Sequence, residues 1–534
     1  MGNKSNREPI LSVENLKIEF HDHASPETAV EDFDLELFPG EIVGFVGESG
    51  SGKSLSAMAI AGLLNRKSLT KSGRIMFQGK ELLTCSRSVL RTFQGDEISM
   101  IFQEPNTSLN PVKKIGWQIE ESLRIHHLDV SPAKRKERAV KMLADVGMYN
   151  PEKIYEMYPH ELSGGMRQRV MIAAAMIGNP QILIADEPTT ALDVTVQAQI
   201  VELLRKINRE KGTAIIFISH DLSLVRQLCS RVLVMQKGKV VESGDTEQIF
   251  NSPKNSYTKE LIAAIPVVDI ANDTEYIDEF KYSEDVLKVK DLNVYYRNHK
   301  TGLFSKSNRQ QILKSVSLSM KKGEILGLVG ESGSGKSTLA KTIVGINKDF
   351  EGTIQKTDDY PQMIFQDPYG SLNPGRSVRW ILRESLRADR KKKWTEEEID
   401  KRMKDVLTQV ELPLEYLDRM PSQLSGGQRQ RVSIALSLMQ RPDILIADEP
   451  VSALDVTIQA QILKLLEHLH EKLGISILFI SHDLRVVYHL CDHVAIMKKG
   501  KIVEFGQTRD IYKNPQADYT KELLQSAGIV DLGI

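Results

Sequence analysis

The chain has 534 residues, with 70 Lys and Arg against 71 Asp and Glu and a formal net charge of -1 at pH 7. This length leaves room for more than one domain with its own hydrophobic core. The balanced charge excludes a general electrostatic affinity for nucleic acid, so we expect no nucleic-acid partner.

The cysteines and the apolar runs bear on where the protein works. Cys85, Cys229 and Cys491 form no C-x-x-C pair, which favours a reducing compartment and argues against a zinc or iron–sulfur site. No apolar run approaches the roughly 18–20 residues needed to cross a bilayer. The polar N-terminus lacks the apolar core of a secretion signal. We therefore expect a soluble, cytosolic protein that reaches a membrane only through partners.

An eight-residue stretch, Gly-Glu-Ser-Gly-Ser-Gly-Lys-Ser, occurs at 47–54 and again at 330–337. Each copy lies between a predicted buried strand and a predicted helix, which is the context of a phosphate-binding loop. Glycines let backbone N–H groups cradle phosphate oxygens, and a helix N-terminus attracts negative charge. A flexible Gly/Ser turn explains one copy but not an identical pair. The predicted nucleotide-binding residues are Gly47, Glu48, Ser49, Gly50, Ser51, Gly52, Lys53 and Ser54, and Gly330, Glu331, Ser332, Gly333, Ser334, Gly335, Lys336, Ser337 and Thr338.

Other motifs show that the whole domain is duplicated. Leu-Ser-Gly-Gly at 162–165 returns 262 residues later at 424–427, and 182–188 returns at the same spacing. Between the phosphate loop and the next shared motif, the first half is about 20 residues longer. We expect this extra segment, within 73–97, to form a longer β-hairpin. The predicted domains are 1–266 and 286–534, joined by an acidic linker at 267–285.

Within each half, strand-like apolar runs alternate with helix-like runs, which predicts an α/β core around a largely parallel sheet. Segments 115–146 and 378–410 are charged with spaced apolar residues and indicate helical insertions.

Two apolar strands end in acidic pairs, Asp186-Glu187 and Asp448-Glu449. Ligands of open α/β sheets lie at the carboxyl ends of strands, so these acids are expected to face the nucleotide. The first acid of each pair is placed to hold hydrated Mg²⁺. An acidic turn after a core strand is the alternative, and it explains less beside two phosphate loops.

The Leu-Ser-Gly-Gly motif opens a helix-like run in each half. Its serine is a natural N-cap, and the bare Gly-Gly amides with the helix dipole form a second anion site. The residues concerned are Ser163, Gly164 and Gly165, and Ser425, Gly426, Gly427 and Gln428.

Each half thus shows, in order, a phosphate loop, a glutamine, Leu-Ser-Gly-Gly, a strand ending in Asp-Glu, Ala-Leu-Asp and a histidine. In this order the chain resembles a fused pair of ATP-binding-cassette (ABC) ATPases over nearly its whole length. The resemblance implies an α/β fold with two tandem ABC-type P-loop ATPase domains. Each domain would have a RecA-like core, an antiparallel β subdomain and a helical subdomain.

The resemblance also implies residue roles, with ATP and Mg²⁺ as cofactors. Glu187 and Glu449 would polarise the attacking water, while His220 and His482 would contact the γ-phosphate. Each signature serine would bind the ATP held by the other half, so the two halves pair within one chain. Met166 replaces the usual final glutamine of the first signature, and we expect little loss of activity from it. The implied magnesium ligands are Ser54, Gln103 and Asp186 in the first half, and Ser337, Gln366 and Asp448 in the second. Phe20 and Tyr296 are the candidates for stacking on adenine, with packing within their alternating strands as the alternative. Asp193 and Asp455 would form the D-loops.

Two further patterns narrow the resemblance. Residues 104–111 and 367–374 match each other, as do the ends of the halves at 253–261 and 515–523. Both are similar to ATPases of bacterial dipeptide and oligopeptide importers, and the fused form resembles glutathione and microcin C importers. This implies import of peptide-like solutes with two integral-membrane permease subunits and an extracytoplasmic solute-binding protein. The chain would lie at the cytoplasmic face of the plasma (inner) membrane.

Three other cassette proteins are alternatives. Fused monosaccharide-importer ATPases usually lose catalytic residues in one half, whereas both sets are complete here. A translation factor would have a long, charged, helical linker instead of the acidic segment. A DNA-repair cassette would carry zinc-type cysteine pairs. Two full catalytic sets also argue against a purely structural role.

Overall fold

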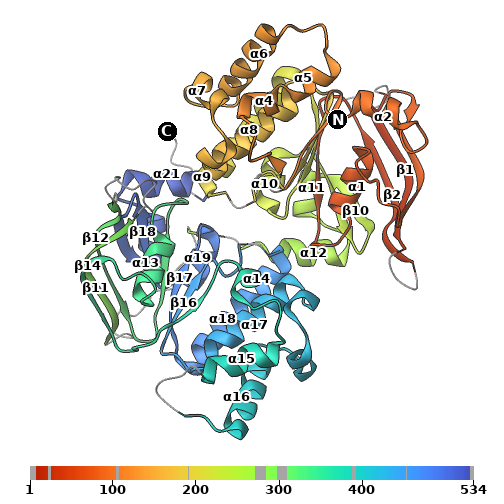
Figure 1. Ribbon diagram of the computed structural model, residues 1–534. Coiled ribbons are helices and arrows are strands. Elements are labelled where there is room, and N and C mark those ends of the chain that lie inside the picture. The colour runs from red at the N-terminus through yellow and green to blue at the C-terminus, as the bar shows by residue number, and fades with distance from the viewer. Residues whose placement is uncertain are drawn as a thin grey trace. The chain divides into compact units, whose positions relative to one another are not determined.

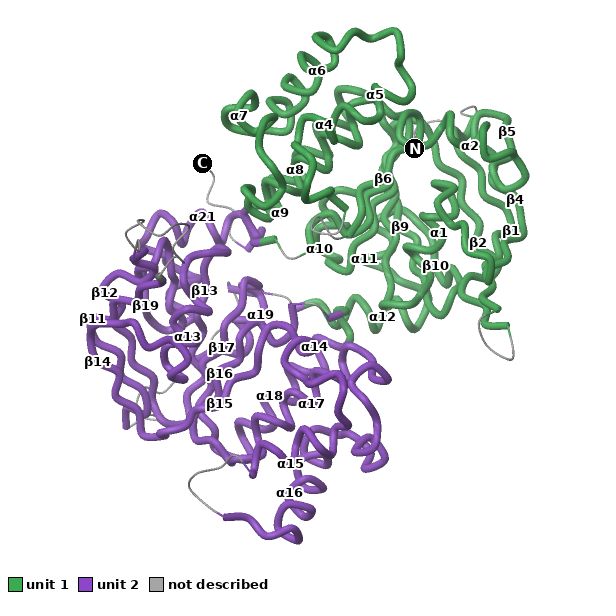
Figure 2. The backbone as a smooth tube through the Cα atoms, in the orientation of Figure 1, with its two compact units in different colours: residues 1–192, 196–265, 455–457 green, residues 193–195, 266–454, 458–534 purple. Residues whose placement is uncertain are grey.

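The computed structural model describes residues 8–21, 26–103, 108–190, 192–266, 268–270, 284–297, 309–387, 393–452 and 454–529. The chain divides into two compact units (Figure 2). Unit 1 comprises 1–192, 196–265 and 455–457, and unit 2 comprises 193–195, 266–454 and 458–534. The predicted acidic linker at 267–285 lies mostly outside the described residues.

The core of unit 1 is a six-stranded sheet in the order β10-β9-β3-β8-β7-β6. Figure 1 labels its edge strand β10, which lies beside α11 (Thr246–Asn251). Its strands pair in parallel except for β10, which is antiparallel to β9. Every residue of β3, β7 and β8 is buried, as expected for parallel strands covered on both faces. The strands are β3 (Ile42–Val46), β6 (Ile98–Ile101), β7 (Ile182–Asp186), β8 (Ala214–Ile218), β9 (Arg231–Gln236) and β10 (Lys239–Asp245).

An antiparallel sheet in the order β2-β1-β4-β5 adds a second layer. Alternate residues of β3 separate the two hydrophobic clusters of the unit, because successive side chains of a strand point to opposite faces. Val43 and Phe45 pack with the antiparallel sheet, whereas Ile42 and Val46 pack with the helices. The strands are β1 (Leu11–Phe20), β2 (Glu27–Leu37), β4 (Leu69–Phe77) and β5 (Lys80–Glu81).

The helices of unit 1 confirm the predicted insertion at 115–146. This region holds three helices, and α6 begins at Pro132 with a Ser131 N-cap. The helices are α1 (Lys53–Ile60), α2 (Arg87–Phe93), α4 (Ile115–Ile119), α5 (Glu121–His126), α6 (Pro132–Asp145), α7 (Pro151–Glu156), α8 (Gly164–Met176), α9 (Val194–Lys211), α10 (Leu222–Leu228), α11 (Thr246–Asn251) and α12 (Ser256–Ala263).

Unit 2 repeats this architecture, with a six-stranded sheet in the order β15-β16-β17-β13-β18-β19 and an antiparallel sheet in the order β12-β11-β14. The predicted α/β fold with antiparallel and helical subdomains is thereby confirmed in both units. The strands are β11 (Asp285–Arg297), β12 (Arg309–Lys321), β13 (Ile325–Val329), β14 (Phe350–Lys356), β15 (Gln362–Ile364), β16 (Ile444–Asp448), β17 (Ser476–Ile480), β18 (His493–Lys498) and β19 (Lys501–Gln507). The helices are α13 (Lys336–Ile343), α14 (Pro368–Ser371), α15 (Val378–Arg387), α16 (Glu396–Gln409), α17 (Gly426–Leu438), α18 (Val456–Leu473), α19 (Leu484–Leu490), α20 (Thr508–Lys513) and α21 (Asp518–Ser526).

The extra segment of the first half differs from the predicted long hairpin. β4 and β5 form only a short hairpin, and the chain then enters α2. Ser86 caps this helix by accepting a hydrogen bond from Val89 N, and Phe93 packs edge-to-face on Phe77 with ring centroids 5.6 Å apart. A cap and one buried aromatic therefore favour a helix where the polar composition suggested a strand. In unit 2, β14 leads to β15 without these elements.

Across the described ranges, the helices include none with the length and apolar character needed to cross a membrane.

Candidate active sites

The phosphate loop of unit 1 joins β3 to α1. Gly47 has φ +145°, and a Cβ at this position would lie 2.1 Å from the Met235 carbonyl oxygen, so only glycine fits. The Lys53 side chain is buried, and its ammonium donates hydrogen bonds to the carbonyls of Gly47 and Glu48, both at 2.8 Å. Burial lowers the pKa of Lys53, while nearby carboxylates oppose this shift.

The loop of unit 2, between β13 and α13, has the same geometry. Gly330 has φ +155°, and a Cβ there would lie 2.1 Å from the Met497 carbonyl oxygen. Lys336 Nζ donates to the carbonyls of Gly330 at 2.7 Å and Glu331 at 2.9 Å. The predicted strand, Gly-rich turn and helix are therefore present twice.

Behind each loop, a serine hydroxyl meets the first acid of the acidic pair. Ser54 Oγ donates to Asp186 Oδ1 at 2.9 Å, and Ser337 Oγ donates to Asp448 Oδ1 at 3.1 Å. Burial, assisted by the charge of Glu187, raises the pKa of Asp186 to about 6, and burial also raises that of Asp448. Mg²⁺ favours hard oxygen ligands and is usually held by one or two protein groups plus phosphates and water. These hydroxyl and carboxylate oxygens fit such an ion.

The second acid of each pair is held in a backbone conformation that is uncommon for glutamate. Glu187 and Glu449 both have φ +48°, and such residues cluster at functional sites. The Glu187 backbone N–H still bonds to the Ile218 carbonyl at 2.9 Å, as Glu449 N–H does to Ile480 at 3.0 Å. The chain therefore turns at the end of the strand without leaving the sheet.

The glutamine, glutamate and histidine predicted to act together do come together in unit 1. Gln103 Nε2 donates to Glu187 Oε2 at 2.9 Å, and His220 Nδ1 lies 3.3 Å from the same oxygen. The Thr190 hydroxyl also donates to Glu187 Oε2, at 2.8 Å, a contact that the sequence reasoning missed. Burial alone would raise the pKa of Glu187, but His220 and Thr190 bring it below its usual value. The carboxylate is therefore ionised near neutral pH.

Unit 2 forms the corresponding cluster. Gln366 Nε2 lies 2.9 Å from Glu449 Oε2, and His482 Nδ1 lies 3.3 Å from it. Burial would lower the pKa of His482, but the adjacent Glu449 raises it above the usual value. Glu187 raises the pKa of His220 in the same way. Ser452 replaces the threonine and directs its hydroxyl to the Glu449 backbone carbonyl at 3.2 Å.

The signature serines cap their helices as predicted. Ser163 Oγ accepts from Met166 N at 3.3 Å at the start of α8. At the start of α17, Ser425 Oγ accepts from Gln428 N at 3.3 Å, and Gln428 Oε1 accepts from Ser425 N at 2.9 Å. This reciprocal capping box is possible only in unit 2, because methionine has no oxygen to return the bond.

The two predicted adenine-stacking residues differ. Tyr296 is 38% exposed, and its hydroxyl accepts from Asn347 Nδ2 at 3.1 Å and lies 3.4 Å from the hydroxyl of Thr338, next to the phosphate loop. Phe20, at the end of β1, is half-buried and packs against the core cluster of its own layer. The structure therefore places Tyr296 beside its loop, whereas Phe20 shares its surroundings with core residues.

The predicted D-loop aspartates lie next to threonines that the sequence reasoning did not identify. Within unit 1, Asp455 Oδ1 accepts from Ser49 N at 2.8 Å and from Ser49 Oγ at 3.0 Å, and Thr457 Oγ1 donates to Glu48 Oε1 at 2.9 Å. In unit 2, Thr195 Oγ1 donates to Asp193 Oδ1 at 2.7 Å. The repeated Asp-Val-Thr spacing was the available signal. Ala191, Ala453 and residues 104–107 lie outside the described residues.

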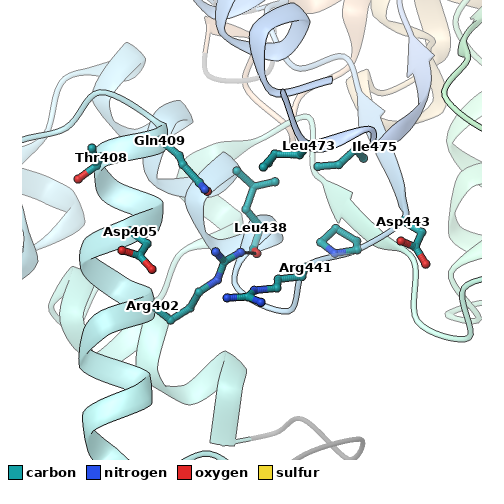
Figure 3. Close-up of a pocket in the computed structure, with 10 residues that line it drawn as sticks. Arg402, Asp405, Thr408, Gln409, Leu438, Arg441, Asp443, Leu473 and Ile475 are labelled. Carbon is teal, nitrogen blue, oxygen red and sulfur yellow. Dashed lines mark hydrogen bonds between the residues drawn. The ribbon is translucent and has the colours of Figure 1, made fainter. Parts of the chain in front are cut away.

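Unit 2 also contains a cavity of about 550 Å³ (Figure 3). Arg402, Arg441 and Gln409 contribute to its lining. Arg402 donates to the carbonyls of Leu438 at 2.5 Å and Met439 at 3.2 Å, and so it satisfies the last turn of α17. None of the predicted site residues lines this cavity.

Comparisons with known proteins show which family the chain belongs to. The family model for ABC transporters matches residues 30–190 and 313–452, and that for the oligopeptide/dipeptide transporter C-terminal region matches 241–285 and 503–532. The chain is 43% identical to a peptidoglycan transport ATP-binding protein, YejF, of Agrobacterium fabrum, covering 98% of this chain and 97% of that protein. It is 40% identical to the glutathione import ATP-binding protein GsiA of Salmonella typhimurium, covering 98% and 90%.

Among solved structures, RNase-L Inhibitor has a TM-score of 0.61 at 20% identity, covering 96% of this chain and 93% of that chain. An archaeal ribosome recycling factor, aABCE1, in complex with the stalk protein aP1, has a TM-score of 0.62, also at 20% identity, and covers 96% and 92%. At this identity the likeness shows the tandem cassette fold alone. The family-model matches and the full-length relatives carry the assignment: this chain belongs to the ABC transporter ATPases, with two ATPase domains in tandem.

Proposed function

We propose that this chain hydrolyses ATP to drive import of peptides or peptide-like solutes, as the ATP-binding subunit of a membrane transporter. The observation that carries this proposal is the match to the oligopeptide/dipeptide transporter C-terminal region at the end of each half. Relatives named for peptidoglycan transport and glutathione import align over 98% of the chain and support the same solute class.

The proposed complex contains two integral-membrane permease subunits and an extracytoplasmic solute-binding protein, with this chain at the cytoplasmic face of the plasma (inner) membrane. Relatives named as transport and import ATP-binding proteins support this arrangement. The helical subdomains, one in each half, are the proposed contacts with the two permease subunits.

In the proposed reaction, loop amides and Lys53 or Lys336 bind the phosphates of ATP. Mg²⁺ would be held by Ser54 and Asp186 with Gln103, or by Ser337 and Asp448 with Gln366, and would neutralise phosphate charge. Glu187 and Glu449 orient the attacking water and accept its proton, a role that requires ionised carboxylates. Burial would raise the pKa of both glutamates, but the adjacent histidines bring it below its usual value. His220 and His482 hold these carboxylates and reach toward the γ-phosphate.

We further propose that each ATP is closed by the signature serine of the opposite half. The first site would then combine Lys53, Gln103, Glu187 and His220 with Ser425, and the second Lys336, Gln366, Glu449 and His482 with Ser163. Ser163 and Ser425 support this proposal, because each is exposed and caps the N-terminus of a helix, where phosphate is attracted.

The solute class is tested by gene deletion and complementation. Uptake of labelled dipeptides, tripeptides and glutathione should be lost in the deletion strain and restored by the native chain. A Glu187→Gln/Glu449→Gln chain should not restore uptake, while monosaccharide uptake should stay unchanged throughout. Undiminished peptide uptake together with lost sugar uptake would contradict the proposal and favour a sugar importer.

A further inference from the structure

A buried tyrosine at the C-terminal end of each half contacts the phosphate loop. Tyr257 of α12 and Tyr519 of α21 are each 5% exposed. The Tyr257 hydroxyl accepts a hydrogen bond from the backbone N–H of Glu48 at 3.1 Å, and the Tyr519 hydroxyl accepts one from Glu331 at 3.0 Å. The tyrosines are more than 180 residues from their partners in the chain, yet the contact occurs in both units.

This hydrogen bond acts on a peptide group that also binds the loop lysine. The N–H of Glu48 and the carbonyl of Gly47 belong to one peptide, and that carbonyl accepts from Lys53 Nζ at 2.8 Å. A planar peptide with both polar groups bonded has its orientation fixed. The same peptide follows the glycine whose left-handed φ is required by the close carbonyl of Met235.

The tyrosine is itself fixed to the core sheet. In unit 1, Glu242 of β10 accepts hydrogen bonds from the backbone N–H groups of Lys254 at 2.8 Å and Asn255 at 3.0 Å, just before α12. Asn255 Oδ1 then accepts from Tyr257 N at 2.8 Å. These bonds hold the first turn of the helix, so the hydroxyl has a defined position.

Unit 2 anchors its tyrosine in a similar way. Glu504 of β19 accepts from the backbone N–H groups of Gln516 at 2.8 Å and Ala517 at 3.1 Å, just before α21. Burial raises the pKa of both tyrosines to about 12, so each hydroxyl stays neutral at physiological pH. A neutral oxygen can accept the loop N–H without adding negative charge beside the phosphates.

We propose that Tyr257 and Tyr519 are positioning residues that hold the phosphate loops in the ATP-binding conformation, so that the C-terminal helix of each half supports its nucleotide site. This inference rests on the phosphate-loop assignment proposed above. An ammonium has three N–H donors, so the lysine can share its hydrogen bonds between the loop carbonyls and the phosphates of bound ATP. The tyrosine hydroxyl holds the N–H side of the same Gly–Glu peptide, so the neighbouring amides keep their direction.

The test is the full-length Tyr257→Phe/Tyr519→Phe variant, which loses only the two hydroxyl oxygens. Net hydrogen-bond contributions predict that Kd for MgATP and MgADP rises about 3- to 10-fold. The KM for ATP should rise by a similar factor, while kcat stays within about twofold, because the group acts on binding geometry and not on the attacking water. Should the double variant not fold, each single variant gives the same reading at its own site.

Tyr512→Phe is the matched control. Tyr512 is 1% exposed, lies in α20 near the same chain end and donates to the Leu484 carbonyl at 2.6 Å. Its loss should lower the thermal midpoint without changing nucleotide affinity. If the Tyr257→Phe/Tyr519→Phe variant behaves in this way, with unchanged Kd for both nucleotides, the inference is overturned. Lys53→Ala separates the two assignments. If this variant binds ATP with native affinity, the phosphate-loop assignment itself is contradicted. If it loses ATP affinity while the tyrosine variants keep native affinity, only the inference about the tyrosines is contradicted.

Discussion

The two phosphate loops carry the same eight residues, and their lysines bond to the same two loop carbonyls in each unit. The groups around them differ. Thr190 donates to the Glu187 carboxylate, whereas Ser452 donates to the backbone carbonyl of Glu449. The signature helix of unit 1 lacks the capping box that Gln428 forms in unit 2. Both units thus share the side chains that we expect to contact phosphate, metal or water. The residues that hold these side chains in place differ between the units. We therefore expect both sites to hydrolyse ATP, which the following predictions test.

Replacing the glutamates gives the largest expected effect. Glu187→Gln and Glu449→Gln should each remove the catalysis of their own half, and the double variant should reduce ATP turnover by about 10²- to 10⁴-fold, because the amide cannot accept the proton of water. Steady-state ATPase measurements on the single and double variants check this. If one single variant kept the native ATPase rate while the other was inactive, only one half would be catalytic.

Replacing the lysines should weaken nucleotide binding. Lys53→Ala and Lys336→Ala each remove a charged donor, and hydrogen bonds to charged groups predict about a 10- to 100-fold loss of affinity at one site. Calorimetric titration with a non-hydrolysable ATP analogue should resolve one weakened and one native site in each variant. Equal weakening of both sites by either variant would contradict independent loops.

The glutamate–histidine pairs predict a pH dependence of stability. In both units the histidine pKa is raised, so its stabilising contribution is fully present below its ordinary value of 6.5 and is lost as pH rises through the raised pKa. The pKa of each glutamate is lowered, so its stabilising contribution is present above the ordinary value of 4.5 and is lost as pH falls through the lowered pKa. His220→Gln/His482→Gln should therefore lose less unfolding free energy between pH 6 and pH 8 than the native chain. Denaturant titrations at both pH values test this, and equal losses would contradict the pairing.

The signature helices give the smallest expected difference. Gln428→Met removes the capping box of α17 and should reduce the stability of its unit by about 0.5–1 kcal/mol. Met166→Gln supplies the side-chain oxygen that a capping box at α8 needs, and it should raise the stability of unit 1 by a few tenths of a kcal/mol. Thermal unfolding of both variants provides the measurement, and a destabilising Met166→Gln would count against the assignment of the difference to capping.

Much of the site was predictable from sequence because its elements are local. The strand, glycine turn and helix around Lys53 follow from adjacent residues, and the N-cap of Ser163 needs only three more positions. The α2 helix was not predicted, since its Phe93 is stabilised by the distant Phe77. The contacts of Thr190 and Tyr257 were also missed. The partner of each of these hydroxyl groups is distant in the sequence or depends on the tertiary fold, so adjacent residues do not reveal it. The sequence does show that Tyr257 and Tyr519 are equivalent, because they lie 262 residues apart, like the other repeated motifs.

The central claim is that each ATP is bound by the loop of one half and the signature of the other, and a double-mutant cycle on the full-length chain tests it most directly. ATPase rates are measured for Ser425→Ala and Ser163→Ala, each alone and combined with Lys53→Ala. Because changes within one site are non-additive, Ser425→Ala should cost little further activity once Lys53 is replaced, whereas Ser163→Ala should keep its full effect. The reverse result, with Ser163→Ala silent and Ser425→Ala fully effective beside Lys53→Ala, would contradict the account.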